Sequence, residues 1–134
     1  PVNKYVAEFI GSPSMNFIEG QLENSNFEFD DLSFNLDGYS FKEKIKSTSK
    51  AWLGVRPENI IINETDKTMP VNFNVVVEVV EPMGADTLVW SSLNGKEIRF
   101  IVEGNKTINI GDKLSVGFDP AHISIFDFDT ENRL

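Results

Sequence analysis

Cysteine is absent from the sequence, and histidine occurs once, as His122. The lack of cysteine excludes a disulfide framework and fits a reducing compartment. A zinc site would need at least two carboxylate ligands beside His122, and a Ser/His/Asp catalytic set would depend on the same residue. Carboxylate pairs such as Asp30-Asp31, and Asp127 with Asp129, are expected to be solvated in so acidic a chain. We therefore predict no catalytic residue and no metal site, and we expect His122 to pack or hydrogen-bond structurally.

Long apolar runs and basic residues are also scarce. The longest purely apolar stretches have three residues, as at 75–77, whereas a membrane-spanning helix needs about 20. Twelve basic residues stand against 21 acidic ones, a net charge of -9, so a polyanion would be repelled and we expect no nucleic-acid partner. Four lysines are expected to form a solvated loop, with a phosphate or acidic-partner site as the alternative: Lys42, Lys44, Lys46 and Lys50.

A phosphate-binding loop is missing as well. A P-loop requires Gly-x-x-x-x-Gly-Lys-Ser/Thr, and the nearest fragment is Gly95-Lys96. Trp90 stands where the first glycine should be, and Glu97 stands where the hydroxyl should be. The chain therefore cannot bind ATP in that way.

The first ten residues differ from the rest in their periodicity. Their apolar residues follow the i, i+3, i+4, i+7, i+8 spacing of one helix face: Val2, Tyr5, Val6, Phe9 and Ile10. Gly11 can end such a helix, and Pro13 prevents it from resuming. One short helix followed only by strands, with no initiator Met, is expected to be the end of an upstream domain in an excised fragment.

From residue 17 onward the period changes to two, and short segments are bounded by turn residues. Residues 32–36 alternate and are followed by Asp37-Gly38, whose dipeptide suits a two-residue turn. A returning strand should begin at 39–41. The pattern therefore predicts a hairpin here.

The clearest strand lies at 71–79, where one face should belong to the core: Val71, Phe73, Val75, Val77 and Val79. Four further short strands are expected, at 87–90, 96–102, 114–118 and 123–126. Asn94-Gly95 joins the first two of these as a hairpin. The spacing predicts an all-β fold, an OB-type small barrel of Greek-key topology preceded by one short N-terminal helix, with a sandwich as the alternative.

Four segments carry a family signature. Residues 1–17 are PVNKYVAEFIGSPSMNF, 53–60 are LGVRPENI, 79–87 are VVEPMGADT and 119–127 are DPAHISIFD. In this order they resemble the C-terminal part of sugar-importer ABC ATPases of the maltose and glycerol-phosphate type. Asn59 stands where the family has His or Asp, Asp86 stands where it has Glu, and residues 22–50 match no family motif.

The resemblance implies a transport-associated OB (TOBE-type) domain with a second, more divergent OB-like half. It assigns 1–17 to the end of an upstream nucleotide-binding domain and a hinge, and 18–134 to a regulatory domain. ATP and Mg would bind in that upstream domain, and no cofactor is expected in this chain. The hinge would comprise Phe9, Gly11, Ser12, Pro13, Met15 and Asn16.

The matched motifs also suggest contact and turn residues. Candidates for a contact with the nucleotide-binding domain are Gly54, Arg56, Pro57 and Glu58. For the last three, a structured corner is the alternative. Structural turns are expected at Glu81, Gly84, Asp119, Pro120, Phe126 and Asp127. For Glu81 and Gly84, a contact with a partner is the alternative.

The function that the resemblance implies is non-catalytic: a regulatory and dimerisation domain in the ATP-hydrolysing subunit of a bacterial ABC sugar importer. Expected partners are a second copy of the domain, the nucleotide-binding domain, the membrane subunits and a regulatory protein, on the cytoplasmic side. The alternative is a small-oxyanion site, since related barrels bind molybdate or sulfate through backbone amides and hydroxyls. A module for single-stranded nucleic acid would need a basic groove with aromatic platforms, and no Trp or Tyr lies within 42–50.

Overall fold

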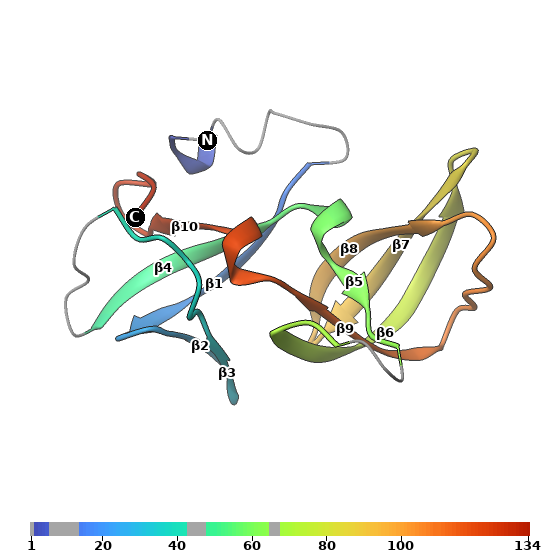
Figure 1. Ribbon diagram of the computed structural model, residues 1–134, viewed down its shortest axis with the longest axis horizontal. Coiled ribbons are helices and arrows are strands. Elements are labelled where there is room, and N and C mark those ends of the chain that lie inside the picture. The colour runs from blue at the N-terminus through green and yellow to red at the C-terminus, as the bar shows by residue number, and fades with distance from the viewer. Residues whose placement is uncertain (1, 6–13, 43–47, 65–67) are drawn as a thin grey trace. The chain divides into compact units, whose positions relative to one another are not determined.

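Strands dominate the computed structural model, which describes residues 2–5, 14–42, 48–64 and 68–134 (Figure 1). The strands are β1 (Asn16–Glu23), β2 (Asn26–Phe29), β3 (Leu32–Asn35), β4 (Thr48–Val55), β5 (Ile61–Ile62), β6 (Val71–Pro82), β7 (Asp86–Leu93), β8 (Lys96–Glu103), β9 (Lys113–Phe118) and β10 (Ser124–Asp127). Two short 3-10 helices accompany them, η1 (Pro57–Asn59) and η2 (Pro120–His122). The prediction of an all-β chain is confirmed. No helix within the described ranges has the length and apolarity that a membrane crossing requires.

The chain divides into two compact units, and each unit has its own five-stranded sheet. The first unit comprises Pro1–Arg56 and Asp119–Leu134, and the second comprises Pro57–Phe118. The second unit is therefore inserted, in sequence, between β4 and η2 of the first. The expected division between 1–17 and 18–134 stays a prediction.

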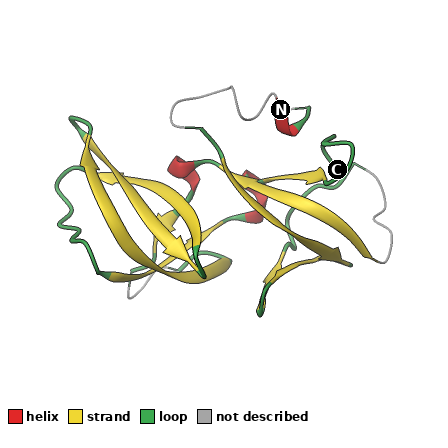
Figure 2. Cartoon of the chain, turned by 180° about the vertical axis from the view of Figure 1, so that it is seen from behind, coloured by secondary structure: helices red, strands yellow, loops and turns green. Residues whose placement is uncertain are grey.

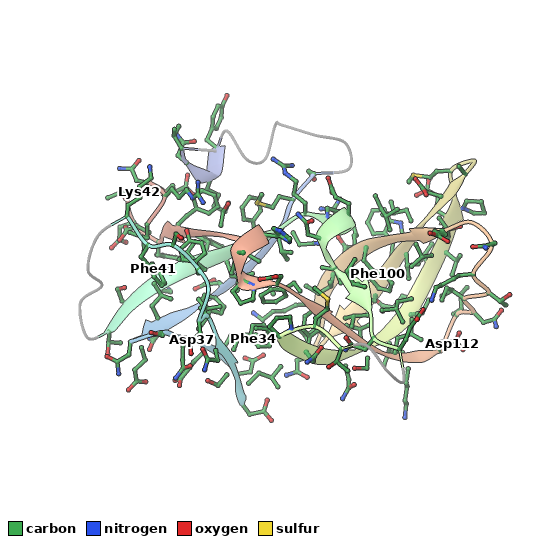
Figure 3. The ribbon with its side chains drawn as sticks, viewed as in Figure 1. Phe34, Asp37, Phe41, Lys42, Phe100 and Asp112 are labelled. Atoms are coloured by element: carbon green, nitrogen blue, oxygen red, sulfur yellow. The ribbon has the colours of Figure 1, made fainter. Side chains whose placement is uncertain are left out.

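The sheet of the first unit has the strand order β10-β4-β1-β2-β3, and all its neighbours are antiparallel. Its core side chains are apolar and come from all five strands: Ile18, Leu22, Phe27, Phe29, Phe34, Ala51, Leu53, Val55 and Ile125. Phe34, labelled in Figure 3, packs edge-on against Phe29 with ring centroids 5.2 Å apart. Removal of such apolar surface from water, at about 25 cal/mol per Å², is the main stabilisation of this unit.

The predicted hairpin across the Asp37-Gly38 turn is wrong in its second strand. The turn itself forms, and Gly38 has a φ of 101°. However, 39–41 is not a strand, and β3 pairs with β2 instead. The Tyr39 hydroxyl accepts a hydrogen bond from the Ile125 N–H at 3.1 Å, so this residue turns into the core of the first unit rather than extending a ladder.

Two hairpins were not predicted, and they connect β1 to β2 and β2 to β3. Their turns contain Asn24 with a φ of 56° and Asp30 with a φ of 51°. Asn and Asp tolerate this left-handed conformation better than other non-glycine residues. Asp30 therefore serves a tight turn.

The sheet of the second unit has the order β5-β9-β6-β7-β8. Its edge strands β5 and β8 also contact each other, so the sheet curls toward closure, as Figure 2 shows. The interior is apolar: Val71, Phe73, Val75, Val77, Val89, Ile98, Phe100, Val116 and Phe118. Phe100, labelled in Figure 3, is fully buried. This curled sheet agrees with the predicted small barrel rather than with a sandwich.

Strand β6 confirms most of the predicted core face but not its end. Val79 is 50% exposed, whereas Val71 through Val77 on alternate positions are buried. A β-bulge shifts the register between Val77 and Val79, and one extra residue reverses which side chains face inward. The predicted Asn94-Gly95 hairpin between β7 and β8 is confirmed, with φ angles of 51° and 81° at the two turn residues.

Of the predicted N-terminal helix over residues 1–10, residue 1 and residues 6–10 lie outside the described ranges. Only Lys4 and Tyr5 are helical in the described part of this segment. Among the four lysines expected in one loop, Lys44 and Lys46 lie outside the described ranges, and Lys42 is exposed near the end of a described range. Lys50 belongs to β4, so the expected loop is wrong at that residue.

Candidate functional site

The predicted hinge is described only at its C-terminal end, since Phe9, Gly11, Ser12 and Pro13 lie outside the described ranges. Met15 is 5% exposed and belongs to a small apolar cluster of the first unit. Asn16 opens β1, and its side-chain Nδ2 donates to the Val55 carbonyl at 3.1 Å. Both residues therefore belong to the packed first unit.

The predicted contact residues lie in the sequence around the point where the chain passes from the first unit to the second, between Arg56 and Pro57. Gly54 is buried in β4, and a Cβ placed there would lie 2.5 Å from the Met15 sulfur. Its proximity to Met15 makes it a packing position. Arg56 is half-buried, Pro57 is buried in η1, and Glu58 is exposed. Of the four predicted contact residues, the exposed Glu58 can be reached most directly by a partner.

The predicted turn at 81–84 divides into two parts. Glu81 lies within β6, and its Oε2 accepts a hydrogen bond from the Trp90 indole N–H at 3.4 Å. Gly84 has a φ of 91°, and the Met83 N–H donates to the Asp86 carbonyl at 2.8 Å across the same turn. Gly84 therefore makes the reversal, while Glu81 takes part in a surface contact.

The chain returns from the second unit to the first at Asp119, which caps the 3-10 helix η2. The Asp119 Oδ1 accepts from the Ala121 N–H at 2.9 Å, and Pro120 follows at the first position of η2, where its missing N–H costs nothing. The His122 side chain is exposed rather than packed, which corrects the packing expectation. The cap and the proline thus form the turn that was predicted at Asp119 and Pro120.

Asp127 closes another turn after β10. Its Oδ1 accepts from the N–H groups of Asp129 and Thr130, at 3.0 and 2.9 Å. The carboxylate thus holds local backbone, while Phe126 is fully buried beside Met15. Within the described residues, no group of three or more His, Cys, Asp or Glu side chains could hold a metal ion.

A cluster that the sequence did not reveal covers the other face of the first sheet. We call it the aromatic–lysine array; it consists of Lys4, Phe17, Lys50, Trp52 and Phe128. Each lysine ammonium lies over an aromatic ring, and the rings of Trp52 and Phe128 stack at 5.5 Å. Alternation in β1 and β4 could have placed Phe17 and Trp52 on one face, but nothing local brings Lys4 to them.

A second unpredicted surface lies on the second unit. We call it the β6–β8 outer face; it consists of Val76, Val79, Trp90, Glu97 and Arg99. Cross-strand pairing places Val79 beside Trp90 and Trp90 beside Arg99. Val76 and Val79 are 41% and 50% exposed. Arg99 lies over the Trp90 ring at 5.5 Å and 4.0 Å from a Glu97 carboxylate oxygen. This face is an apolar strip bordered by both signs of charge.

These features define a class of protein, an all-β module of OB type. Two family models match it, the MalK OB fold domain at residues 11–60 and the TOBE domain at residues 53–126, which is more than half of the chain. The chain belongs to the TOBE domain family.

Two relatives that match this chain are named as import ATP-binding proteins. The xylose/arabinose import ATP-binding protein XacK of Haloferax volcanii is 31% identical over 138 residues, covering 100% of this chain and 36% of XacK. The sn-glycerol-3-phosphate import ATP-binding protein UgpC of Psychromonas ingrahamii is 35% identical over 143 residues, covering 100% of this chain and 36% of UgpC. The chain thus spans about a third of the length of these relatives. The expected resemblance to ABC importer ATP-binding proteins is confirmed.

A solved structure shares the fold. The cytoplasmic molybdate-binding protein ModG, crystallised with molybdate bound, superposes with a TM-score of 0.59 at 12% sequence identity. The match covers 87% of this chain and 97% of the ModG chain. At this identity the likeness concerns the fold alone.

Proposed function

We propose that the chain is the non-catalytic regulatory module of an ATP-hydrolysing subunit in an ABC sugar importer. One observation carries the proposal: the two family matches together run through both units, and the relatives are named import ATP-binding proteins. ATP and Mg would be held by a nucleotide-binding domain of the same subunit, because this sequence has no P-loop. Such a subunit works on the cytoplasmic side, against the membrane subunits of the transporter.

The module acts by pairing with a second copy of itself. The β6–β8 outer face supports this, because Val76 and Val79 leave apolar surface in water while Arg99 and Glu97 stand together at its border. A two-fold axis that passes between these two residues would bring Arg99 of each copy toward Glu97 of the other, which is how a face with both signs of charge can pair with itself. A stable pair buries about 800 Å² of surface on each partner. The chain has 7611 Å² of accessible surface, so the pair would need about a tenth of it.

Regulation would then depend on an equilibrium between two arrangements of the paired modules. A ligand or regulatory protein that binds one arrangement better than another shifts the population toward it. The shift can be no larger than the difference in affinity for the two arrangements. The chain therefore needs no reacting group of its own to control hydrolysis elsewhere in the subunit.

Sedimentation velocity over a range of chain concentrations tests the pairing. The wild-type chain should associate, and Val79→Lys should weaken association at least tenfold, because burying an unpaired ammonium is costly. Ile61→Lys is the matched control, since Ile61 is 44% exposed but lies on β5, outside this face. A chain that stays monomeric at several hundred micromolar, or a Val79→Lys variant that associates like the wild type, would remove the support for pairing through this face.

A further inference from the structure

The N-terminal segment 2–5 lies against the end of the chain within the first unit. The Lys4 N–H donates to the Glu131 carbonyl at 3.0 Å, and the Arg133 N–H donates to the Val2 carbonyl at 3.0 Å. Figure 1 and Figure 2 both place the two chain ends close together. Backbone contacts thus join residues 2–4 to residues 131–133.

The Lys4 side chain adds a contact that the backbone does not require. Its Nζ lies 4.6 Å from the ring centroids of both Phe17 and Trp52 and 3.9 Å from a Glu131 carboxylate oxygen. Only 13% of the side chain is exposed. An ammonium removed this far from water needs compensation, and two aromatic faces and one carboxylate supply it.

The rings that receive Lys4 are fixed by other contacts. Trp52 stacks on Phe128 with an interplanar angle of 17°, and Phe17 packs against the buried Phe126 with centroids 6.1 Å apart. Phe17 projects from β1 and Trp52 from β4, two strands paired over eight residues. A slot whose walls are already ordered loses little entropy when it is filled.

We propose that the slot between Phe17 and Trp52 is a cation-recognition site and that Lys4 is its occupant, acting as a releasable latch. The slot accepts an ammonium or guanidinium group and disfavours a neutral or acidic one. When Lys4 is bound, segment 2–5 moves as part of the first unit. When Lys4 leaves, the backbone hydrogen bonds of segment 2–5 open with it. This final inference rests on the proposed function: if the chain is the regulatory module of a larger subunit, the latch couples the domain before it to the sheet of the first unit.

Amide hydrogen exchange of the complete 134-residue chain tests the latch. The amides of Lys4 and Arg133 report it, because their hydrogen bonds join the two segments. Lys4→Met removes the charge but keeps the length of the side chain, and it should speed exchange at both positions by about 2- to 30-fold after correction for intrinsic rates. Lys4→Arg keeps a cation that stacks on aromatic rings and should stay within about twofold of the wild type.

Two controls separate release of the latch from general loosening. The Leu134 amide donates to the Ile125 carbonyl at 2.8 Å and should not change, because this bond does not involve the N-terminal segment. Lys42→Met removes a charge from an exposed lysine and should leave all these amides unaffected. In the wild-type NMR spectrum, the Lys4 methylene protons should be shifted upfield by the ring currents of Phe17 and Trp52, and those of Lys42 should not.

The proposal would be overturned if the amides at positions 4 and 133 exchanged at the same rate in Lys4→Met as they do in the wild type. So would Lys4 proton shifts that match those of Lys42. Both measurements are made on the chain at concentrations where it is monomeric, and neither depends on pairing. A negative result here therefore leaves the sedimentation test standing, and a negative sedimentation result leaves the latch standing.

Discussion

Replacement of Gly54 by alanine tests whether this residue packs inside the first unit or serves a surface contact. The added Cβ would meet the Met15 sulfur at 2.5 Å and ring carbons of Phe126 and Phe17 at 3.1 and 3.2 Å. Ordinary carbon contacts lie at about 3.5–4.0 Å. The sulfur must therefore move by about 1 Å, and both rings must yield by a few tenths of an ångström.

Two opposing effects set the magnitude of the Gly54→Ala change. Extra volume in a packed region costs about 1–3 kcal/mol. Loss of glycine freedom in the unfolded chain returns about 0.4–1 kcal/mol where the native backbone suits alanine. We expect the packing effect to win, with a net loss of about 0.5–2.5 kcal/mol in the free energy of unfolding of the first unit.

Urea unfolding followed by tryptophan fluorescence measures this loss. Trp52 lies in the first unit and Trp90 in the second, so a Trp90→Phe background makes the signal specific to the first unit. With a denaturant slope of about 1–3 kcal/mol per molar urea, the midpoint should fall by about 0.2–2.5 M. Two units can unfold separately, so a signal specific to one of them is needed before a two-state fit.

A double-mutant cycle with Met15→Ala sharpens the test. Removing the sulfur relieves the closest contact, so Gly54→Ala should cost at least 0.5 kcal/mol less in that background, about the coupling expected of touching residues. A Gly54→Ala variant as stable as the wild type, or a cycle with no coupling, would refute the packing role and favour a contact role for Gly54.

Four further outcomes follow from individual contacts. Tyr39→Phe should destabilise the first unit by about 1–3 kcal/mol, because it leaves the Ile125 N–H without its hydroxyl acceptor. Gly95→Ala should destabilise the second unit by about 1–2 kcal/mol, since φ at this turn residue is 81°. Asp119→Ala should cost about 0.5–2 kcal/mol, and Asp119→Asn less, because the side chain caps η2. Calorimetric titration with molybdate or sulfate should show no tight binding if regulation rather than oxyanion recognition is the role of the chain.

Each of these outcomes has a direct readout. Trp52 fluorescence reports Tyr39→Phe and Asp119→Ala, and Trp90 fluorescence in a Trp52→Phe background reports Gly95→Ala. A Tyr39→Phe or Gly95→Ala variant within 0.3 kcal/mol of the wild type would contradict the assigned contacts, as would equal losses for Asp119→Ala and Asp119→Asn. Micromolar uptake of an oxyanion would reverse the order of the two candidate functions.

Local patterns predicted the second unit well. Alternation at 71–77 and the Asn94-Gly95 turn act between neighbouring residues, so β6 and the β7–β8 hairpin follow from sequence alone. The bulge before Val79 could not be predicted, because it arises from how β6 meets β7 after the strand has formed. That single inserted residue places Val79 on the β6–β8 outer face.

The first unit was predicted less well because its sheet depends on distant pairings. β4 pairs with β1 and with β10, which are far from it in the sequence. The turns that connect β1 to β2 and β2 to β3 contain Asn24 and Asp30 rather than glycine or proline, which are the strongest turn signals in a sequence. The motif around Gly54 was recognised, but its role depends on the distance to Met15, and the meeting of Lys4 with Trp52 has no sequence signature at all.

The most direct measurement is an isotope-filtered NOE experiment on an equal mixture of labelled and unlabelled chain, which detects only contacts between copies. At concentrations where the chain associates, the methyl groups of Val76 and Val79 should show NOEs to protons of the other copy. NOEs between copies that arise only elsewhere, for example at Ile61, or their absence from an associated sample, would contradict a regulatory module that pairs through this face.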